Sequence, residues 1–206
     1  MKRVGIIGGM GPLASADLYL KIIEATAAKS DQENIPLVID SYPQIEDRTA
    51  FILGKGENPL PRLIESASRL KNANCAAFAI ACNTAHFFAD DIVAAVDLPI
   101  IHIAEVTVKS ILQNHKEAHK IAVLATIGTK KARIYDEPLK SAGLISVELG
   151  EQIQNTLMDC IYKGVKAGKI NEYVGVFEDL LGKIDADIFI AGCTEIPLFL
   201  PLIKSD

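Results

Sequence analysis

Two cysteines stand in similar short motifs, and each follows an apolar run. Cys82 opens the motif Cys-Asn-Thr and Cys193 opens the motif Cys-Thr-Glu, while the runs before them, 75–81 and 187–192, are typical of buried strands. Ligands of open α/β sheets bind outside the carboxyl ends of the strands. The small polar residues after each cysteine could hold an anion beside the sulfur. The pattern therefore predicts two half-sites that place a thiol on either side of a bound carboxylate.

The composition favours a soluble enzyme. The chain has 206 residues, half of them hydrophobic, and a formal net charge of −5 with its basic residues scattered, so partners such as nucleic acid or an anionic membrane are not expected. No uncharged apolar run reaches the roughly 18 residues of a bilayer span. Four cysteines do not make a disulfide framework in a chain of this size. We therefore expect a cytoplasmic protein.

Apolar runs alternate with amphipathic segments along the whole chain, which is typical of repeated βα units. Strands are expected at 3–8, 36–41, 75–81, 99–103, 120–125, 144–149 and 187–192. Helices are expected near 12–29, 58–72, 84–95, 104–114, 130–141, 151–167 and 171–183. This order predicts an α/β fold with mostly parallel sheets.

The order of strand and cysteine motif recurs in the two halves of the chain. We therefore expect two similar α/β domains, one at 1–98 with the first cysteine and one at 99–206 with the second. The active site is expected in the cleft between them.

The glycine-rich turn after the first strand supports a different function. Gly9, Gly11 and Ala14 fit the dinucleotide fingerprint, and Asp40 ends the next strand where a ribose-binding carboxylate would lie. Pro12 weakens the match, because it then depends on three small residues that any tight strand-to-helix turn could contain. An NAD(P)-dependent oxidoreductase stays an alternative, as does a non-catalytic protein that binds small acids.

Five motifs together resemble the aspartate/glutamate racemase family, and most closely its aspartate racemase branch. They are Gly8-Gly-Met-Gly-Pro12, Tyr42-Pro-Gln-Ile-Glu-Asp-Arg48-Thr, Ala81-Cys-Asn-Thr-Ala-His86, Thr126-Ile-Gly-Thr129 and Gly192-Cys-Thr-Glu-Ile196. The resemblance runs over essentially the whole chain. It implies two α/β domains, catalysis without pyridoxal phosphate or any other cofactor, and commonly a homodimer. Met10 and Gly11 stand where glutamate racemases usually carry Asp-Ser, which favours aspartate over glutamate as the substrate.

The resemblance also implies a reason for two cysteines. Inverting the α-carbon of an amino acid requires a base on one face and an acid on the other, and one residue cannot reach both faces. A thiol has a pKa of about 8.5, which a helix N-terminus or a neighbouring donor can lower enough to give a thiolate near neutral pH. Cys82 and Cys193 are therefore assigned as an acid/base pair that exchanges roles with the direction of the reaction.

The resemblance assigns the substrate contacts as well. Arg48 should bind the side-chain carboxylate through a two-point fork, although without its flanking motif a surface ion pair with Glu46 or Asp47 would be preferred. A lysine should assist, and Lys163 is chosen over Lys166, although helical spacing puts both on a shared face. The remaining substrate-binding candidates are Met10, Gly11, Asn83, Thr84, Thr129 and Thr194.

Other reactive residue types are given structural roles. Cys75 and Cys160 are expected in the core, because free cysteine is among the most buried residue types. His86 is either a partner of the first cysteine loop or a residue of a helix surface. Glu195 is expected to support the second cysteine loop from behind. No plausible set of metal ligands is present in the sequence, so no metal is expected.

Overall fold

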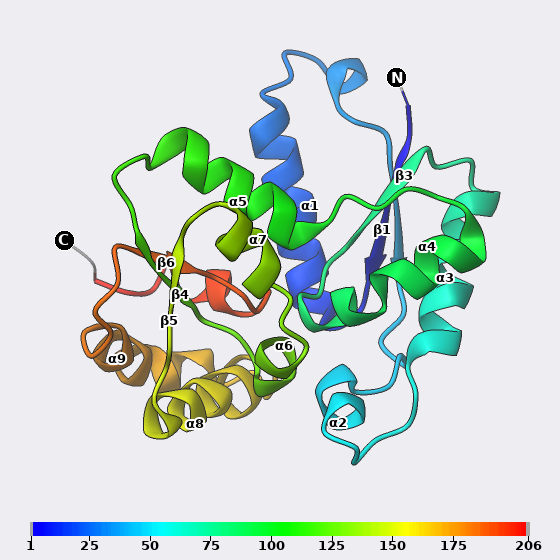
Figure 1. The fold of residues 1–206 in the computed structure, drawn as a ribbon. Helices are drawn as coiled ribbons and strands as arrows, with labels where there is room; N and C mark the ends of the chain where they lie inside the picture. Colours follow the sequence, from blue (N-terminus) through cyan, green and yellow to red (C-terminus); the bar gives the residue numbers. More distant parts are fainter. Residues whose placement is uncertain (1, 205–206) are drawn as a thin grey trace. The chain divides into compact units, whose positions relative to one another are not determined.

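The computed structural model describes residues 2–204, which form two compact units. The first unit extends to Ile103 and the second begins at Ala104. Each unit is built around a three-stranded sheet in which every pair of neighbouring strands is parallel (Figure 1). The predicted α/β fold with mostly parallel sheets is confirmed. Within residues 2–204, no helix combines the length and the apolar character needed to cross a membrane.

The sheet of the first unit has the order β2-β1-β3. Strand β1 (Val4–Gly8) lies in the middle, β2 (Leu37–Ser41) and β3 (Ala77–Ile80) flank it, and Ile6 is paired with Ile39 and with Ala79. The helices of this unit are α1 (Pro12–Thr26), η1 (Asp31–Glu33), α2 (Arg48–Ile52), α3 (Leu60–Asn72), η2 (Thr84–Phe88) and α4 (Ala89–Val96).

Helix α3 shows how the sequence builds this core. Its buried positions are Leu63, Ser66, Ala67 and Leu70, which follow the three- and four-residue spacing of one helix face. Leu63 and Leu70 are fully buried and share a hydrophobic cluster with Phe78 of β3. The apolar stripe therefore packs α3 against the sheet.

The sheet of the second unit has the order β5-β4-β6, with β4 (Lys120–Val123) between β5 (Ile145–Val147) and β6 (Ile188–Ile190). The helical segments are α5 (Ile103–Asn114), α6 (Ile127–Lys131), α7 (Asp136–Ser141), α8 (Glu151–Asp159), the π-helix η3 (Cys160–Val165), α9 (Ile170–Leu181) and η4 (Ile196–Leu198). Phe177 and Phe199 stack in the core, with ring centroids 4.6 Å apart.

The segment 99–103 differs from its expected role as a strand of the second domain. The backbone N–H of Phe78 donates to the carbonyl of Pro99 over 2.9 Å, and that of Ile101 donates to the carbonyl of Phe78 over 2.7 Å. These bonds make one isolated bridge between Phe78 of β3 and Ile100, and the segment does not form a full strand. The division between the compact units therefore falls after Ile103, not after Leu98.

Two other segments also differ from the sequence prediction. The helix expected at 130–141 is divided into α6 and α7, because Arg133 between them has a positive φ of 57°. No helix was expected at 48–52, yet these residues form α2, which begins at Arg48 because the side chain of Asp47 accepts a hydrogen bond from the N–H of Ala50 and caps the helix.

Gly9 lies where the chain turns from β1 towards α1, and its geometry requires a glycine. Its φ is +89°, and a Cβ at this position would lie 2.5 Å from backbone atoms of Tyr42. Gly54 also has a positive φ, of +74°, but no atom lies within 4 Å of the place a Cβ would occupy. An alanine at Gly54 would meet only the strain of a positive φ, whereas an alanine at Gly9 would meet that strain and a close contact with Tyr42 as well.

We expect Gly9→Ala to lower the free energy of unfolding by about 1–3 kcal/mol more than Gly54→Ala does, because backbone atoms cannot move aside as a flexible side chain can. Gly54→Ala carries only the cost of the left-handed conformation, about 1–2 kcal/mol. Urea unfolding of the two variants measures the difference. Equal losses would show that Tyr42 does not confine Gly9.

Candidate active site

The first cysteine motif fills the turn between β3 and η2. β3 ends at Ile80 and η2 begins at Thr84, so Cys82 and Asn83 lie just beyond the carboxyl end of the sheet, as predicted. The N–H of Ala81 continues the sheet by donating to the carbonyl of Ile7 over 2.9 Å. Cys82, Asn83 and Thr84 are all buried. This loop is therefore a packed part of the first unit, with a thiol, an amide and a hydroxyl close together in sequence.

His86 lies behind this loop and has a defined tautomer. Its Nε2 accepts a hydrogen bond from the backbone N–H of Ile103 over 3.2 Å, so its Nδ1 carries the proton and donates to the carbonyl of Cys82 over 2.9 Å. Burial and the nearby His102, whose ring centroid is 4.7 Å away, lower the pKa of His86 to about 4. His86 is therefore a partner of the first cysteine loop and not a residue of a helix surface.

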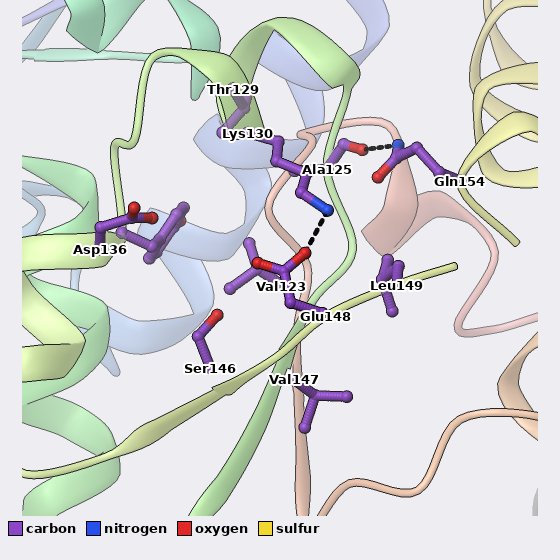
Figure 2. Close-up of a pocket in the computed structure, with 11 residues that line it drawn as sticks. Val123, Ala125, Thr129, Lys130, Asp136, Ser146, Val147, Glu148, Leu149 and Gln154 are labelled. Carbon is purple, nitrogen blue, oxygen red and sulfur yellow. Dashed lines mark hydrogen bonds and ion pairs between the residues drawn. The ribbon is translucent and has the colours of Figure 1, made fainter. Parts of the chain in front are cut away.

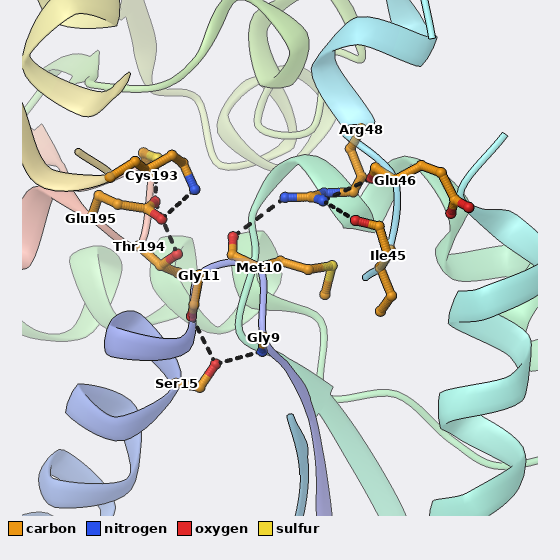
Figure 3. Close-up of polar contacts among 11 residues, drawn as sticks. Gly9, Met10, Gly11, Ser15, Ile45, Glu46, Arg48, Cys193, Thr194 and Glu195 are labelled. Carbon is orange, nitrogen blue, oxygen red and sulfur yellow. Dashed lines mark hydrogen bonds and ion pairs between the residues drawn. The ribbon is translucent and has the colours of Figure 1, made fainter. Parts of the chain in front are cut away.

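Arg48 is held against the glycine-rich loop of the same unit. Its guanidinium donates to the carbonyls of Ile45 over 3.1 Å, Glu46 over 2.8 Å and Met10 over 3.4 Å (Figure 3). The carboxylate of Glu46 pairs with Arg62 at 2.8 Å. Arg48 is buried. Its position therefore does not fit the alternative of a surface ion pair with Glu46 or Asp47.

The hydroxyl of Ser15 stabilises the backbone of the same loop. It accepts from the N–H of Gly9 over 2.9 Å and donates to the carbonyl of Gly11 over 3.0 Å (Figure 3). Met10 lies in the hydrophobic cluster that also contains Cys82. The first unit thus brings together the predicted site residues Met10, Gly11, Arg48, Cys82, Asn83 and Thr84.

The second cysteine follows β6 and lies beside a buried carboxylate. The thiol of Cys193 donates to Oε2 of Glu195 over 2.9 Å, and the hydroxyl of Thr194 donates to the same oxygen over 3.4 Å (Figure 3). Lys166 binds the other oxygen of Glu195, with 2.6 Å between Nζ and Oε1. Burial and the charge of Glu195 raise the pKa of Cys193 well above its ordinary value. The role expected for Glu195 is confirmed in a stronger form, since it bonds directly to the thiol.

The two lysines considered for substrate binding occupy different surroundings. Lys163 forms an exposed ion pair with Asp159 at 2.9 Å, whereas Lys166 lies at Glu195. The N–H of Lys166 donates to the carbonyl of Ile161, five residues earlier, over 3.0 Å, which is the π-helical pattern. The two lysines were assigned to a shared face on the spacing of a regular α-helix. That spacing does not hold here.

Thr129 lies on the first turn of α6. The side chain of Thr126 caps this helix by accepting from the N–H of Thr129 over 3.2 Å. Thr129 also lines a hollow, across which Lys130 pairs with Glu148 at 2.5 Å (Figure 2). Gln154 borders the hollow and donates to the carbonyl of Ala125 over 2.9 Å. The second unit thus holds Thr129, Lys163, Cys193 and Thr194, and Lys163 pairs with Asp159, not with Glu195.

The structure adds one group that the sequence analysis did not single out. Tyr135 is buried in the second unit, where burial raises the pKa of its hydroxyl. No motif marks this tyrosine. Cys75 and Cys160 lie in the two cores as expected, and burial raises the pKa of Cys160 to about 11. Within residues 2–204, no group of three or more His, Cys, Asp or Glu residues could hold a metal ion.

The protein is of the class of α/β proteins with two parallel-sheet units. Each unit carries a buried cysteine in the turn after a strand. The family model of the Asp/Glu/Hydantoin racemases matches residues 7–206. The chain therefore belongs to this racemase family.

Relatives of known sequence and structure agree with this membership. The chain is 28% identical over 214 residues to the broad specificity amino-acid racemase RacX of Bacillus subtilis (strain 168), covering 98% of this chain and 89% of RacX. An aspartate racemase homologue from Pyrococcus horikoshii OT3 matches at a TM-score of 0.72 and 27% identity, over 100% of this chain and 89% of that one. The aspartate racemase of Picrophilus torridus has the same fold, with a TM-score of 0.77 at 24% identity over 97% and 84%.

The neutral state of His86 makes stability depend on pH. Between about pH 6.5 and about pH 4 the unfolded chain binds a proton at this histidine that the folded chain does not, so the free energy of unfolding falls as the pH falls. The loss from this group reaches about 3 kcal/mol, at about 1.4 kcal/mol for each pH unit.

We expect His86→Gln to flatten the dependence of stability on pH in this interval, although the variant is less stable at neutral pH because the bonds to Cys82 and Ile103 change. Urea unfolding followed by circular dichroism at several pH values measures this. His115→Gln, which removes an exposed histidine, should keep the slope of the parent protein. An unchanged slope in His86→Gln would contradict the assignment.

Proposed function

We propose that this protein is a cofactor-independent amino-acid racemase that acts on aspartate, with glutamate as the alternative substrate, through two-base proton transfer by Cys82 and Cys193. The observation that carries the proposal is that in each unit a buried cysteine, followed by polar residues, lies in the turn just after a strand. Membership of the racemase family and the similarity to RacX support the same reaction class.

The proposed reaction needs one thiolate and one thiol. The thiolate takes the α-proton, so an S–H bond forms, the Cα–H bond breaks and its electron pair stays on the substrate. The thiol on the opposite face then gives its proton to the α-carbon and becomes the thiolate. The next turnover in the opposite direction restores the first state, so no external acid, base or cofactor is consumed.

Hydrogen bonds to the α-carboxylate would lower the barrier, because negative charge develops there when the α-proton leaves. We propose that these bonds come from Asn83, Thr84, Thr129 and Thr194. All four lie next to a cysteine or on the first turn of a short helix, and the first three are buried. Side chains that are already packed in place need little reorganisation when charge develops.

Arg48 is proposed to bind the side-chain carboxylate of the substrate. Its bonds to the carbonyls of Ile45, Glu46 and Met10 fix the plane of the guanidinium before a substrate arrives. Met10 and Gly11 would form the wall beside it. Lys163 is the second proposed cation, and it would have to leave its exposed ion pair with Asp159 to reach a carboxylate.

Asp40 is the second sequence signal for the oxidoreductase alternative, and the structure gives it a partner within the protein. Asp40, the expected ribose-binding carboxylate, pairs with Arg69 at 3.1 Å. The small-acid-binding alternative differs from the racemase in chemistry alone, so a measurement of proton exchange separates them.

The two-base mechanism predicts that Cys82→Ser and Cys193→Ser each lower racemisation by on the order of 10²-fold or more, because each variant lacks one acid/base group. Each variant should still exchange the α-proton of the one enantiomer whose hydrogen faces the remaining cysteine. The two variants should therefore prefer opposite enantiomers. Chiral chromatography measures racemisation, and NMR in deuterium oxide measures the exchange.

The matched controls are Cys75→Ser and Cys160→Ser, which remove thiols of the two cores and should keep racemisation close to the parent level in the folded fraction. If Cys82→Ser or Cys193→Ser still interconverted the enantiomers at the parent rate, the two cysteines would not be the paired bases.

Arg48→Lys should reduce kcat/KM for aspartate strongly and for alanine less, since a single ammonium cannot replace a two-point fork and alanine has no second carboxylate. Arg62→Lys, which alters an exposed arginine paired with Glu46, is the control and should affect both substrates little. Steady-state kinetics with both amino acids give the comparison. Equal losses for aspartate and alanine in Arg48→Lys would assign Arg48 another task.

A further inference from the structure

Cys193 is linked to two ionisable groups that the proposed mechanism does not use, Glu195 and Lys166. The thiol donates to one oxygen of Glu195 over 2.9 Å, and the ammonium of Lys166 lies 2.6 Å from the other oxygen. The side chain of Glu195 is only 4% exposed, and that of Lys166 is 25% exposed. A buried carboxylate thus connects the second cysteine to a lysine.

This arrangement stabilises one protonation state of the cysteine. A protonated thiol supplies the hydrogen that Oε2 of Glu195 accepts. A thiolate at the same place would put two negative charges in contact inside the protein, beside the ammonium of Lys166. The like charges would therefore disfavour loss of the thiol proton.

We infer that Glu195 is a positioning residue that holds Cys193 as a protonated thiol, so that this cysteine begins the proposed reaction as the proton donor, and that Lys166 is a positioning residue that offsets the charge left when the proton is given up. The inference rests on the proposed function for the meaning of that proton, but not for the state of the thiol. When the donor step occurs, the S–H bond breaks and a C–H bond forms at the substrate. Lys166 then offsets one of the two charges left on Cys193 and Glu195.

The position of Lys166 follows from the π-helix that precedes it. The five-residue hydrogen bond from Lys166 to Ile161 widens the last turn of this segment. Lys163, three residues earlier, instead pairs with the exposed Asp159. The irregular turn therefore separates a lysine that pairs with the buried carboxylate from one that pairs on the surface.

The titration of Cys193 tests the inference. The ultraviolet absorbance of the thiolate is measured against pH, as the difference between each protein and the same protein carrying Cys193→Ser. Glu195→Gln should lower the midpoint by about one pH unit or more, a tenfold change in the acid dissociation constant, because the carboxylate charge is gone. Lys166→Gln should raise the midpoint, because the offsetting ammonium is gone.

The exposed pair of Lys130 and Glu148 in the same unit supplies matched controls. Glu148→Gln and Lys130→Gln change the net charge by the same amounts and should leave the midpoint in place. A midpoint in Glu195→Gln that stays with its control, or rises, would overturn the inference for Glu195. A fall in Lys166→Gln would overturn it for Lys166. If Glu195→Gln does not fold, Glu195→Asp must keep a high midpoint while Lys166→Gln raises it.

This titration is independent of turnover, so its failure differs from failure of the proposed function. An unshifted midpoint combined with loss of racemisation in Cys193→Ser would reject the role of Glu195 and leave the racemase standing. The predicted shifts combined with full racemisation in Cys193→Ser would reject the two-cysteine mechanism and leave the local chemistry standing.

Discussion

Parallel pairing of the strands is the constraint on which both cysteine loops depend. In each unit the central strand, β1 or β4, pairs with its two neighbours in the same direction, so all three carboxyl ends lie at one edge of the sheet. The loops that leave this edge include the glycine-rich turn and the Cys82 turn in one unit, and the Cys193 turn in the other. The site residues follow from the topology, since the hydrogen-bonded ladders fix where each strand ends.

The two cysteines share a place in the fold but differ in their surroundings. Behind Cys82 lies the neutral imidazole of His86, which bonds to the backbone of the loop and adds no charge. Beside Cys193 lies the carboxylate of Glu195 with Lys166, which bonds to the thiol itself. A two-base racemase needs one thiol and one thiolate at the start of a turnover. The charged neighbours of Cys193 give a physical reason for that asymmetry.

The sequence predicted the features that depend on local patterns. Alternating apolar runs gave the strands and the α/β fold, and the spacing of buried residues such as Leu63 and Leu70 marks a helix face. What escaped prediction depends on contacts between distant segments or on irregular backbone. The bridge from Phe78 to Ile100 and the π-turn before Lys166 are examples. A motif also names residue types but not protonation states, so the bond from Cys193 to Glu195 required coordinates.

Exchange of the α-proton is the most direct test of the proposed racemase. Each enantiomer of aspartate is incubated with the parent protein in deuterium oxide, while NMR follows the α-proton signal and chiral chromatography follows the enantiomers. We expect the signal to disappear from both enantiomers as each converts to the other, without added cofactor. Saturable binding of aspartate with the α-proton retained would contradict the proposal and indicate a protein that only binds small acids.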